Sequence, residues 1–331
     1  KYWHVMVYGE FIQKPTVNLC KILSENLPKS LSNTYLTNSG TEAIEAAMKL
    51  AKRVTGRTEI IAAKNGYHGS TQGSMSIMGF EDRKRRYRPL LPGIKFIEFN
   101  NEDDINKINK KTAAVILETI QGGAGFITPS ENYLRKVKDK CEKLNVLLIL
   151  DEIQPGMGRT GKLFAFEHYN IIPDILVYGK GLGGGFPIGA LSSSKKIMSS
   201  FKENPILGHI TTFGGHPVIA AAAYANLKET LDSKIMSKVY EKEKLFKDKL
   251  KHSLITEIRG KGLMLALILK DKNTVNQLVN KCLEKGLILF YLLFESKAVR
   301  ITPPLTIKKS EIKKGCDIII ETLNQINNSV H

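Results

Sequence analysis

Residues 146–154 read VLLILDEIQ and residues 174–185 read DILVYGKGLGGG. Each stretch is a short apolar run, typical of a strand buried on both faces, and each run ends at a polar side chain, Asp151 in the first and Lys180 in the second. Because open α/β sheets hold their ligands at the carboxyl ends of the strands, we expect both side chains to face one site. The glycines that surround Lys180 argue against a lysine that merely packs in the core.

The sequence around these two runs alternates regularly between predicted strands and predicted helices. From Thr41 to about Ser193, short β-rich runs alternate with stretches of helical period, which predicts a mostly parallel sheet covered by helices. The clearest helix spans residues 41–54 and ends at Gly56. Further strands are predicted at residues 59–63, 94–99, 113–118, 146–151 and 174–178, and helices at residues 102–110 and 131–143.

A different pattern follows in the last third of the chain. A long helical stretch, residues 216–252, leads to strands at 255–269, 287–294 and 299–301 and to helices at 274–284 and 310–326. We therefore predict an N-terminal segment (residues 1–30), a large domain (31–230) and a smaller C-terminal α+β domain (231–331). Because the chain starts with Lys1 and its first residues read as the middle of a domain, we expect it to be a fragment of a longer protein.

The composition excludes several classes of protein. Hydrophobic residues make up 42% and charged residues 24%, which is ordinary globular usage. The net charge of +17 raises the question of a nucleic-acid partner, but the lysines are scattered, and we interpret the dense cluster at residues 83–88 as a solvated loop. Apolar runs stop well short of the roughly 20 residues of a membrane span. Four widely spaced cysteines without a CxxC pair favour a reducing cytoplasm, so we expect a cytoplasmic protein without a nucleic-acid, membrane or metal partner.

Two glycine motifs are formally present but lack their context. Gly179, Gly181 and Gly184 match GxGxxG, yet the residues that follow read as turn and strand instead of the helix that receives a dinucleotide. Residues 156–162 have the skeleton of a P-loop, yet Leu163 stands where a hydroxyl would bind magnesium. The sequence therefore predicts neither a dinucleotide site nor an NTPase.

A third stretch of sequence adds a predicted anion site to the amine of Lys180 and the carboxylate of Asp151. The NSGT stretch at residues 38–41 opens the first amphipathic helix, where free N–H groups and the helix dipole attract a phosphate. An amine at Lys180, a carboxylate at Asp151 and this anion site are the three parts that pyridoxal 5′-phosphate (PLP) requires. The amine binds its aldehyde, the carboxylate its ring nitrogen and the helix its phosphate.

Seven motifs in order resemble the class III aminotransferases, the fold-type I PLP enzymes that include ornithine, acetylornithine and other ω-amino transaminases. They read NSGTEA (38–43), GYHG (66–69), LETIQGGAG (117–125), LDEIQPGMGRTG (150–161), YGKGLGGGFPIGA (178–190), TTFGGHP (211–217) and VRITPPL (299–305). The resemblance runs from about His4 to Ile326. It implies an α/β fold with a mostly parallel sheet in a large domain, a smaller C-terminal α+β domain, and a homodimer with its active sites at the interface.

The resemblance also implies roles for single residues. Lys180 would bind the aldehyde of PLP and then move the substrate proton, and Asp151 would pair with the ring nitrogen. Arg300 would grip a substrate carboxylate, because its planar fork suits a bidentate pair. The remaining implied contacts are the phosphate with the backbone of Gly40 and Thr41, the ring face with Tyr67, the 3′-oxygen with Gln154, the phosphate of the other subunit with Thr212, and cofactor or substrate with Glu118.

Several of these residues have a plainer interpretation. The start of the helix at Gly40 and Thr41 is also an ordinary N-terminal cap, and both interpretations hold with the same geometry. Tyr67 has the alternative of a buried core tyrosine, Gln154 that of a solvated turn residue, and Arg300 that of a surface ion pair.

Two departures from the family pattern limit the substrate prediction. Gly123 stands where ornithine-type members carry a glutamate that pairs with the carboxylate-gripping arginine, and Ser70 stands where they carry an arginine for the donor's α-carboxylate. We predict a PLP-dependent transamination from an ω-amino donor, N-acetylornithine or ornithine, to 2-oxoglutarate. The alternatives are a diaminobutyrate, 4-aminobutyrate or diaminopelargonate-type aminotransferase, a semialdehyde aminomutase, a catalytically idle PLP-fold protein, and a basic nucleic-acid binder that kept the fold.

Overall fold

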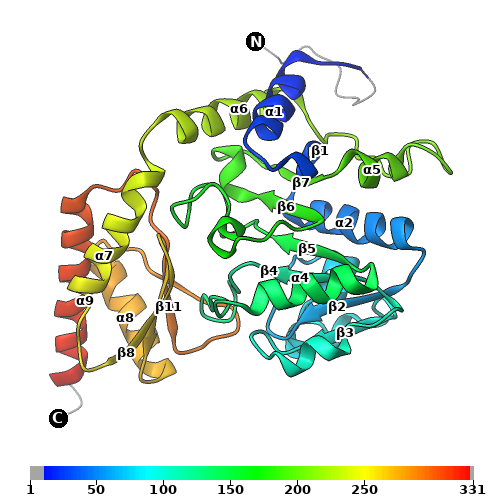
Figure 1. Ribbon diagram of the computed structural model, residues 1–331. Coiled ribbons are helices and arrows are strands. Elements are labelled where there is room, and N and C mark those ends of the chain that lie inside the picture. Colours follow the sequence, from blue (N-terminus) through cyan, green and yellow to red (C-terminus); the bar gives the residue numbers. More distant parts are fainter. Residues whose placement is uncertain (1–10, 329–331) are drawn as a thin grey trace.

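The computed structural model describes residues 11–328. The first ten residues of the predicted N-terminal segment, with His4 where the resemblance begins, lie outside the described residues. The chain forms two sheets with their helices, a large unit that carries most of the labelled elements and a smaller one built from the C-terminal third (Figure 1). Within residues 11–328, no helix combines the length and the apolar content that a membrane crossing requires.

The large sheet is mostly parallel, as the sequence predicts. Its spatial order is β1-β7-β6-β5-β4-β2-β3, and the chain runs parallel from β3 to β6, whereas β7 is antiparallel to both of its neighbours, β6 and β1. The strands are β1 (Asn33–Thr37), β2 (Glu59–Ala63), β3 (Ile94–Ile97), β4 (Thr112–Glu118), β5 (Leu147–Asp151), β6 (Ile175–Gly179) and β7 (Gly189–Ser193).

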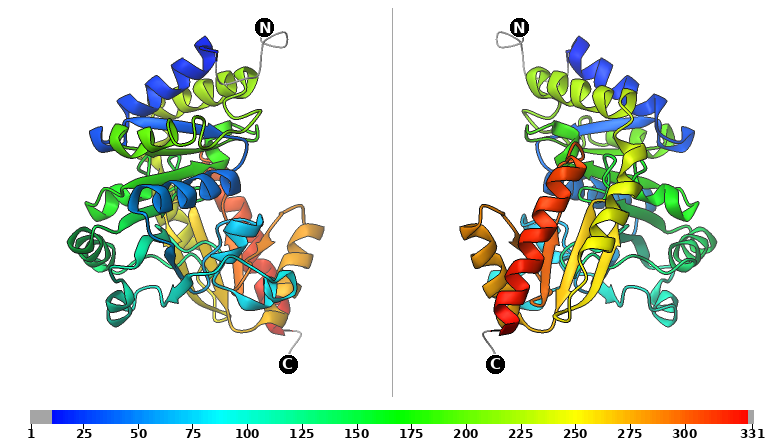
Figure 2. Two further views of the ribbon diagram at one scale, coloured as in Figure 1. Left: turned by 90° about the vertical axis from the view of Figure 1, so that its right-hand side faces the viewer. Right: turned by 90° about the vertical axis from the view of Figure 1, so that its left-hand side faces the viewer.

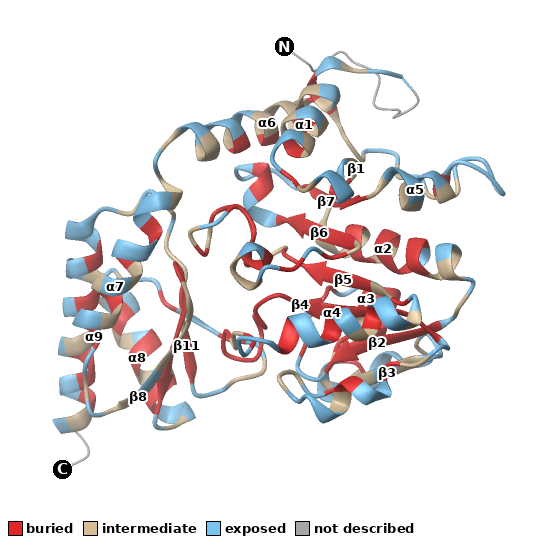
Figure 3. Cartoon of the chain, viewed as in Figure 1, coloured by how far each residue is buried: buried red, intermediate tan, exposed pale blue. Residues whose placement is uncertain are grey.

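Helices cover both faces of this sheet, which is why its central strands are apolar without alternation. Leu148 and Leu150 of β5 pack with α1 (Lys14–Glu25), α4 (Tyr133–Leu144) and α6 (Pro217–Asp232). Ile149, between them, packs on the other face with α2 (Gly40–Thr55). The central strands are buried along nearly their whole length (Figure 3). The carboxyl ends of β5 and β6 are thereby fixed beside each other.

The smaller unit has a four-stranded sheet in the order β10-β11-β9-β8. Helices α7, α8 and α9 lie on the side of this sheet that faces away from the large unit (Figures 1 and 2). Its other side packs against the large unit through an apolar cluster that joins Ile120 and Phe126 to Met264 and Ala266. The elements are α7 (Val239–Lys249), β8 (Ile255–Lys261), β9 (Met264–Leu269), α8 (Lys272–Glu284), β10 (Phe290–Tyr291), β11 (Ala298–Ile301) and α9 (Lys309–Asn328), and the two short helices of the large unit are α3 (Gln72–Ser76) and α5 (Lys195–Met198).

The structure corrects four predicted elements. The helical stretch 216–252 is two helices, α6 and α7, because Ser233 adopts an extended backbone after α6. The strand 255–269 is a hairpin, β8 and β9, that turns at Gly262 with a φ of 63°. Only Phe290–Tyr291 of the strand 287–294 is paired, and the helix 102–110 is a 3-10 turn at Asp103–Lys107. The domain boundary near residue 230 stays a prediction.

The interpretation of residues 83–88 as a solvated loop is wrong for Lys84. Its side chain is 4% exposed, and its ammonium group donates to the carbonyl of Met78 at 2.6 Å. The ammonium nitrogen also lies 4.1 Å from the centre of the Phe96 ring, a cation–π contact. Lys84 therefore anchors the segment that follows α3, while its neighbours in the cluster are exposed.

Candidate active site

A cavity of about 590 Å³ lies between the two units, at the carboxyl ends of β4, β5 and β6. The large unit supplies most of its lining, and the smaller unit adds Met264, Leu293, Arg300 and Thr302. The sequence-predicted site residues that line it are Gly40, Thr41, Tyr67, Glu118, Asp151, Gln154, Lys180 and Arg300. The structure thus brings these eight residues together, although they are spread over 260 positions of the chain.

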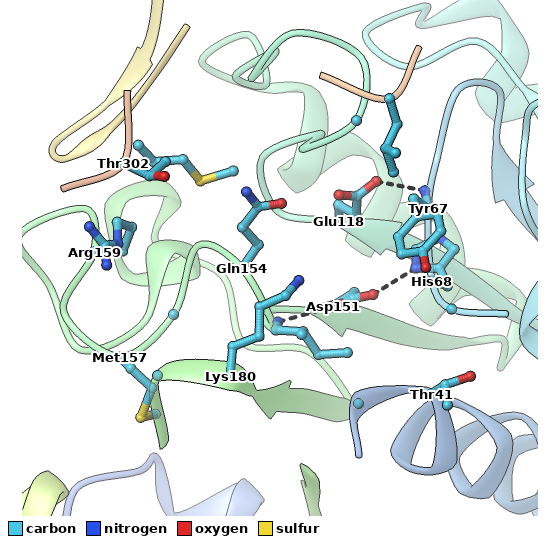
Figure 4. A pocket seen from close by; sticks show the side chains of 18 of the residues that line it. Thr41, Tyr67, His68, Glu118, Asp151, Gln154, Met157, Arg159, Lys180 and Thr302 are labelled. Carbon is cyan, nitrogen blue, oxygen red and sulfur yellow. Dashed lines mark hydrogen bonds and ion pairs between the residues drawn. The ribbon is translucent and has the colours of Figure 1, made fainter. Parts of the chain in front are cut away.

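Asp151 and His68 form a buried pair at the base of the cavity. Asp151 is the last residue of β5, and its Oδ2 lies 2.7 Å from Nδ1 of His68 (Figure 4). The other carboxylate oxygen accepts a hydrogen bond from the amide of Ile153 at 3.0 Å. Burial opposes protonation of His68, but the hydrogen bond and charge of Asp151, helped by Glu118, outweigh it and raise the pKa of His68. The pair therefore presents a carboxylate in a fixed orientation.

Glu118, the last residue of β4, links two loops that line the cavity. Its carboxylate oxygens accept from the amide of Tyr67 at 2.9 Å and from the amide of Gly122 at 2.7 Å. The side chain is buried, and this burial raises its pKa to about 7 against the opposing effect of His68 and of the two amides. Because both oxygens are used in this way, Glu118 fixes the loop of Tyr67 relative to β4.

Lys180 follows β6 directly and reaches into the same cavity. Figure 4 shows its side chain extending toward the region between Asp151 and Gln154. Its backbone has a φ of 40°, in the left-handed region that side chains other than glycine seldom occupy. Such strained positions cluster at functional sites, where the surroundings hold them in place. The sharp turn after β6 aims the amine into the cavity.

The amino end of α2 forms another wall. The side chain of Ser39 caps the helix by accepting from the amide of Glu42 at 3.3 Å, and the first amides of the helix, those of Gly40 and Thr41, have no partner within the helix. A Cβ on Gly40 would lie 2.6 Å from Cδ1 of Ile153, so a larger residue here would force the Ile153 side chain in the loop after β5 to shift. The geometry is that of an anion site as well as of a capped helix.

Arg300 is a partly buried cation that faces the cavity without a counter-ion. Its Nε is buried and has no hydrogen-bond partner among residues 11–328, and no carboxylate of these residues pairs with it. Desolvation lowers the pKa of this guanidinium. Arg159, by contrast, already donates to the carbonyls of Leu263 and Pro303. The Arg300 guanidinium, unlike that of Arg159, is therefore free to bind a substrate carboxylate in the cavity.

Thr212 does not line the cavity of its own chain. It is exposed on the loop before α6. Its predicted contact is with the phosphate of another subunit, and a single chain leaves that prediction untested.

Two residues of the site, His68 and Glu152, have roles that the sequence does not predict. His68 stands next to Tyr67 in the GYHG motif, and its pairing with Asp151 follows from the fold alone. Glu152 is completely buried and accepts from Thr119 Oγ1 at 2.7 Å and from the amides of Ala165 and Phe166 at 2.8 and 2.7 Å. It therefore anchors the glycine-rich loop instead of facing the cavity. The feature of the sequence that could have indicated this role is a second acidic residue directly after Asp151.

Comparisons with known proteins agree with this geometry. Residues 1–323 match the aminotransferase class-III family. The chain is 39% identical to the acetylornithine aminotransferase of Clostridium acetobutylicum, over 98% of this chain and 84% of that protein. It is 37% identical to a LysW-aminoadipate semialdehyde/glutamate semialdehyde transaminase of Sulfolobus acidocaldarius, over 94% of this chain and 80% of that protein. The crystal structure of the ornithine aminotransferase from Toxoplasma gondii has a TM-score of 0.91 and 29% identity, over 98% of this chain and 80% of that one. The predicted fold class is confirmed.

Proposed function

This chain belongs to the class III aminotransferases, which depend on PLP, and from that premise we propose that it transfers the ω-amino group of an N-acetylornithine-type or ornithine-type donor to 2-oxoglutarate. The support for this donor class is the identity of 37–39% with two acetylornithine aminotransferases over nearly the whole chain. The single observation that carries the chemistry is the convergence of Lys180 and the His68–Asp151 pair in one cavity.

The residues of the cavity fit PLP. Asp151, held by His68 and Ile153, has its carboxylate fixed at the base of the cavity and would hold the ring nitrogen. Lys180 would hold the aldehyde, and the free amides at the start of α2 would hold the phosphate. The other proposed contacts are Tyr67 with the ring face and Gln154 with the 3′-oxygen.

The chemistry of the reaction is divided between cofactor and chain. When bound, PLP would supply an electron sink for the substrate carbon next to the amine, and the proton on that carbon would become easier to remove. The Nζ of Lys180 lies at the end of a flexible side chain in the cavity. It would take this proton from the substrate carbon and release it again later in the reaction. The buried Asp151 carboxylate favours a proton on the ring nitrogen, and Glu118 keeps Tyr67 in position through its amide.

Arg300 binds the carboxylate of the 2-oxo acid and of the donor in this proposal. The guanidinium is partly desolvated and lacks an acidic partner among the described residues, so a substrate carboxylate supplies the missing charge. Charge-assisted hydrogen bonds of this kind are roughly twice as strong as neutral ones.

We also propose that the enzyme is a homodimer with its active sites at the interface. The loop that carries Thr212 exposes several large apolar side chains, of which Ile206 is 79% and Ile210 is 64% exposed, and Phe213 is 54% exposed. A patch of this kind favours a protein interface over free solvent. A second copy that covers this loop would bring Thr212 close to a neighbouring cavity.

A cytoplasmic location is proposed as well. The support is the state of the cysteines: Cys20, Cys141, Cys282 and Cys316 are all free thiols, and three of them are buried. Free thiols are typical of a reducing compartment.

The first test concerns the reaction. Lys180→Ala should abolish transamination while the protein stays folded, and borohydride treatment of the loaded wild type should attach the cofactor covalently to the peptide that contains Lys180. Lys162→Ala, which removes an exposed lysine from another glycine-rich loop, is the matched control and should keep full activity. Full activity of Lys180→Ala would contradict the proposed chemistry.

The second test concerns the donor. A panel of N-acetylornithine, ornithine, diaminobutyrate, 4-aminobutyrate and simple amines is assayed with 2-oxoglutarate as acceptor. We expect N-acetylornithine or ornithine to give the highest kcat/KM. If both are inert while another amine reacts, the donor proposal is wrong and the reaction class stands.

A further inference from the structure

Phe290 lies beside Arg300 on the inner face of the smaller sheet. The two residues are direct partners in the antiparallel pairing of β10 with β11, and direct partners point to the same face of a sheet. Arg300 is in turn the partner of Ala266 on β9, which packs against the large unit. Because β10 is the outermost strand, Phe290 is the neighbour of Arg300 on the side away from Ala266.

The ring of Phe290 contacts the Arg300 cation. The central carbon of the guanidinium, Cζ, lies over the ring at 5.8 Å from its centre, which is within the range of a cation–π contact. The negative face of the ring attracts the cation and occupies none of its N–H groups, whereas a carboxylate would accept from them. Arg300 lines the cavity and Phe290 is not among the described residues that line it, so the ring leaves the substrate side of Arg300 open.

A second arginine on the same face of the sheet is held in a different way. Arg259 of β8 is also a partner of Ala266, on the side opposite to Arg300. Its Nε donates to the Glu257 carboxylate at 2.7 Å, and its guanidinium lies 3.9 Å from the Glu295 carboxylate. These acids balance the charge of Arg259. Arg300 has no such acid within residues 11–328, and the ring of Phe290 attracts its guanidinium while the charge stays available.

We propose that Phe290 is a positioning residue for Arg300, which holds the guanidinium at the wall of the cavity before a substrate carboxylate binds. The inference rests on the proposed function, in which Arg300 binds the carboxylate of the 2-oxo acid. A free arginine side chain has many rotamers, and ordering it on binding lowers the affinity for the ligand. A ring that orders the side chain beforehand removes this loss, and it strengthens binding without touching the substrate.

The test changes the ring while it keeps an apolar side chain at this position. Phe290→Leu removes the aromatic face, whereas Phe290→Trp provides a stronger one. The probe is glutarate, a dicarboxylate with the chain length of 2-oxoglutarate and no keto group to react, and its Kd is measured by calorimetry on the PLP-loaded protein. We expect Phe290→Leu to weaken glutarate binding about three- to tenfold, which is the effect of ordering one long side chain. Phe290→Trp should bind glutarate at least as tightly as the wild type does.

Steady-state kinetics separate this role from a purely structural one. Phe290→Leu should raise the KM for 2-oxoglutarate by a similar factor and leave kcat within about twofold of the wild type, because the ring acts on binding and not on the reacting amine. Tyr291→Leu is the matched control. Tyr291 is the next residue of β10 and pairs with Val299 on the opposite face of the sheet, so its replacement should leave both constants unchanged.

Circular dichroism checks that the variants fold, which we expect because Phe290 is 62% exposed, and Phe290→Met replaces Phe290→Leu if the latter does not fold. An unchanged Kd in the folded variant without the ring, an equal loss of affinity in Phe290→Trp or Tyr291→Leu, or a fall in kcat without a rise in KM overturns the inference. Each of these results leaves the proposed function intact. If glutarate neither binds the wild type nor competes with 2-oxoglutarate, the result counts against the proposed role of Arg300 and against this inference with it.

Discussion

Removal of the His68 imidazole should destabilise the protein far more than an ordinary substitution. Nδ1 lies 2.7 Å from Asp151 Oδ2, and the exposed fractions of the two side chains are 0% and 4%. In His68→Ala the carboxylate keeps only the amide of Ile153 and stays buried without its charged partner. Breaking a buried pair at one end costs about 3–5 kcal/mol, whereas most single substitutions cost about 0.5–3 kcal/mol. We expect the free energy of unfolding to fall by an amount in the first range.

The pH dependence of this loss has a definite sign. Because the pKa of His68 is raised in the folded state, the pair contributes fully below the pKa of an unfolded histidine, about 6.5, and the contribution is lost as pH rises through the folded-state value. The difference between wild type and His68→Ala should therefore be larger at pH 6 than at pH 9.

Urea unfolding of the apoprotein at both pH values, followed by circular dichroism, measures these differences. His68→Gln is the matched variant, because its amide still donates a hydrogen bond, and it should lose less stability than His68→Ala. A loss below about 1 kcal/mol for His68→Ala would refute the reasoning, since a buried pair broken at one end costs several times that amount. An equal loss at pH 6 and pH 9 would refute the assignment of the charge to His68.

Three further predictions concern single residues. Gly40→Ala places a Cβ 2.6 Å from Ile153 Cδ1 and should lower the free energy of unfolding by about 1–3 kcal/mol, with partial recovery in the double variant with Ile153→Val. Arg300→Lys loses the planar fork and should raise the KM for 2-oxoglutarate roughly tenfold or more with a smaller change in kcat, as steady-state kinetics will show. Burial raises the pKa of Glu152 to about 7, although its three hydrogen bonds oppose this shift. The stability that the protonated side chain contributes is therefore complete below the ordinary glutamate pKa of 4.5, and it is lost as pH rises through 7. Glu152→Gln should remove this part of the pH dependence, which urea unfolding between pH 4.5 and pH 8 measures.

The sequence predicts the five parallel strands of the large sheet, β2 to β6, but β1 is not among the predicted strands. Burial on both faces leaves a strong local signal in the central strands. The runs at β5 and β6 are apolar at every position up to Asp151 and Tyr178, and the glycine-rich loops that follow them mark where they end. The helix α2 is equally well marked, since Ser39 caps it and Gly56 ends it in the left-handed region with a φ of 67°. Asp151, the last residue of β5, and Lys180, directly after β6, therefore lie at the edge of the sheet where the sequence predicts them.

The smaller unit is predicted less accurately because its turns depend on contacts that are distant in the sequence. Gly262 lies against the backbone of Arg159 and Thr160, more than a hundred residues earlier, and this contact fixes the turn that splits one predicted strand into β8 and β9. Similarly, Lys84 is buried through its contacts with Met78 and Phe96, although its neighbours in the sequence are charged. A local charge pattern carries no information on such a contact.

The position of Arg300 shows why the substrate end of the site depends on packing between the units. Lys180 and Asp151 stand at the ends of neighbouring strands of one sheet, so their separation is set by backbone hydrogen bonds. Arg300 stands on β11, and its distance from Lys180 is set by the apolar cluster that joins Ile120, Phe126 and Ala165 of the large unit to the inner face of the smaller sheet. A core substitution in that cluster would shift Arg300 relative to the reacting amine without touching either residue, because side chains in a close-packed interface transmit small displacements. The two parts of the site are therefore separable: strand pairing fixes the position of the reacting amine, whereas packing between the two units fixes the position of Arg300.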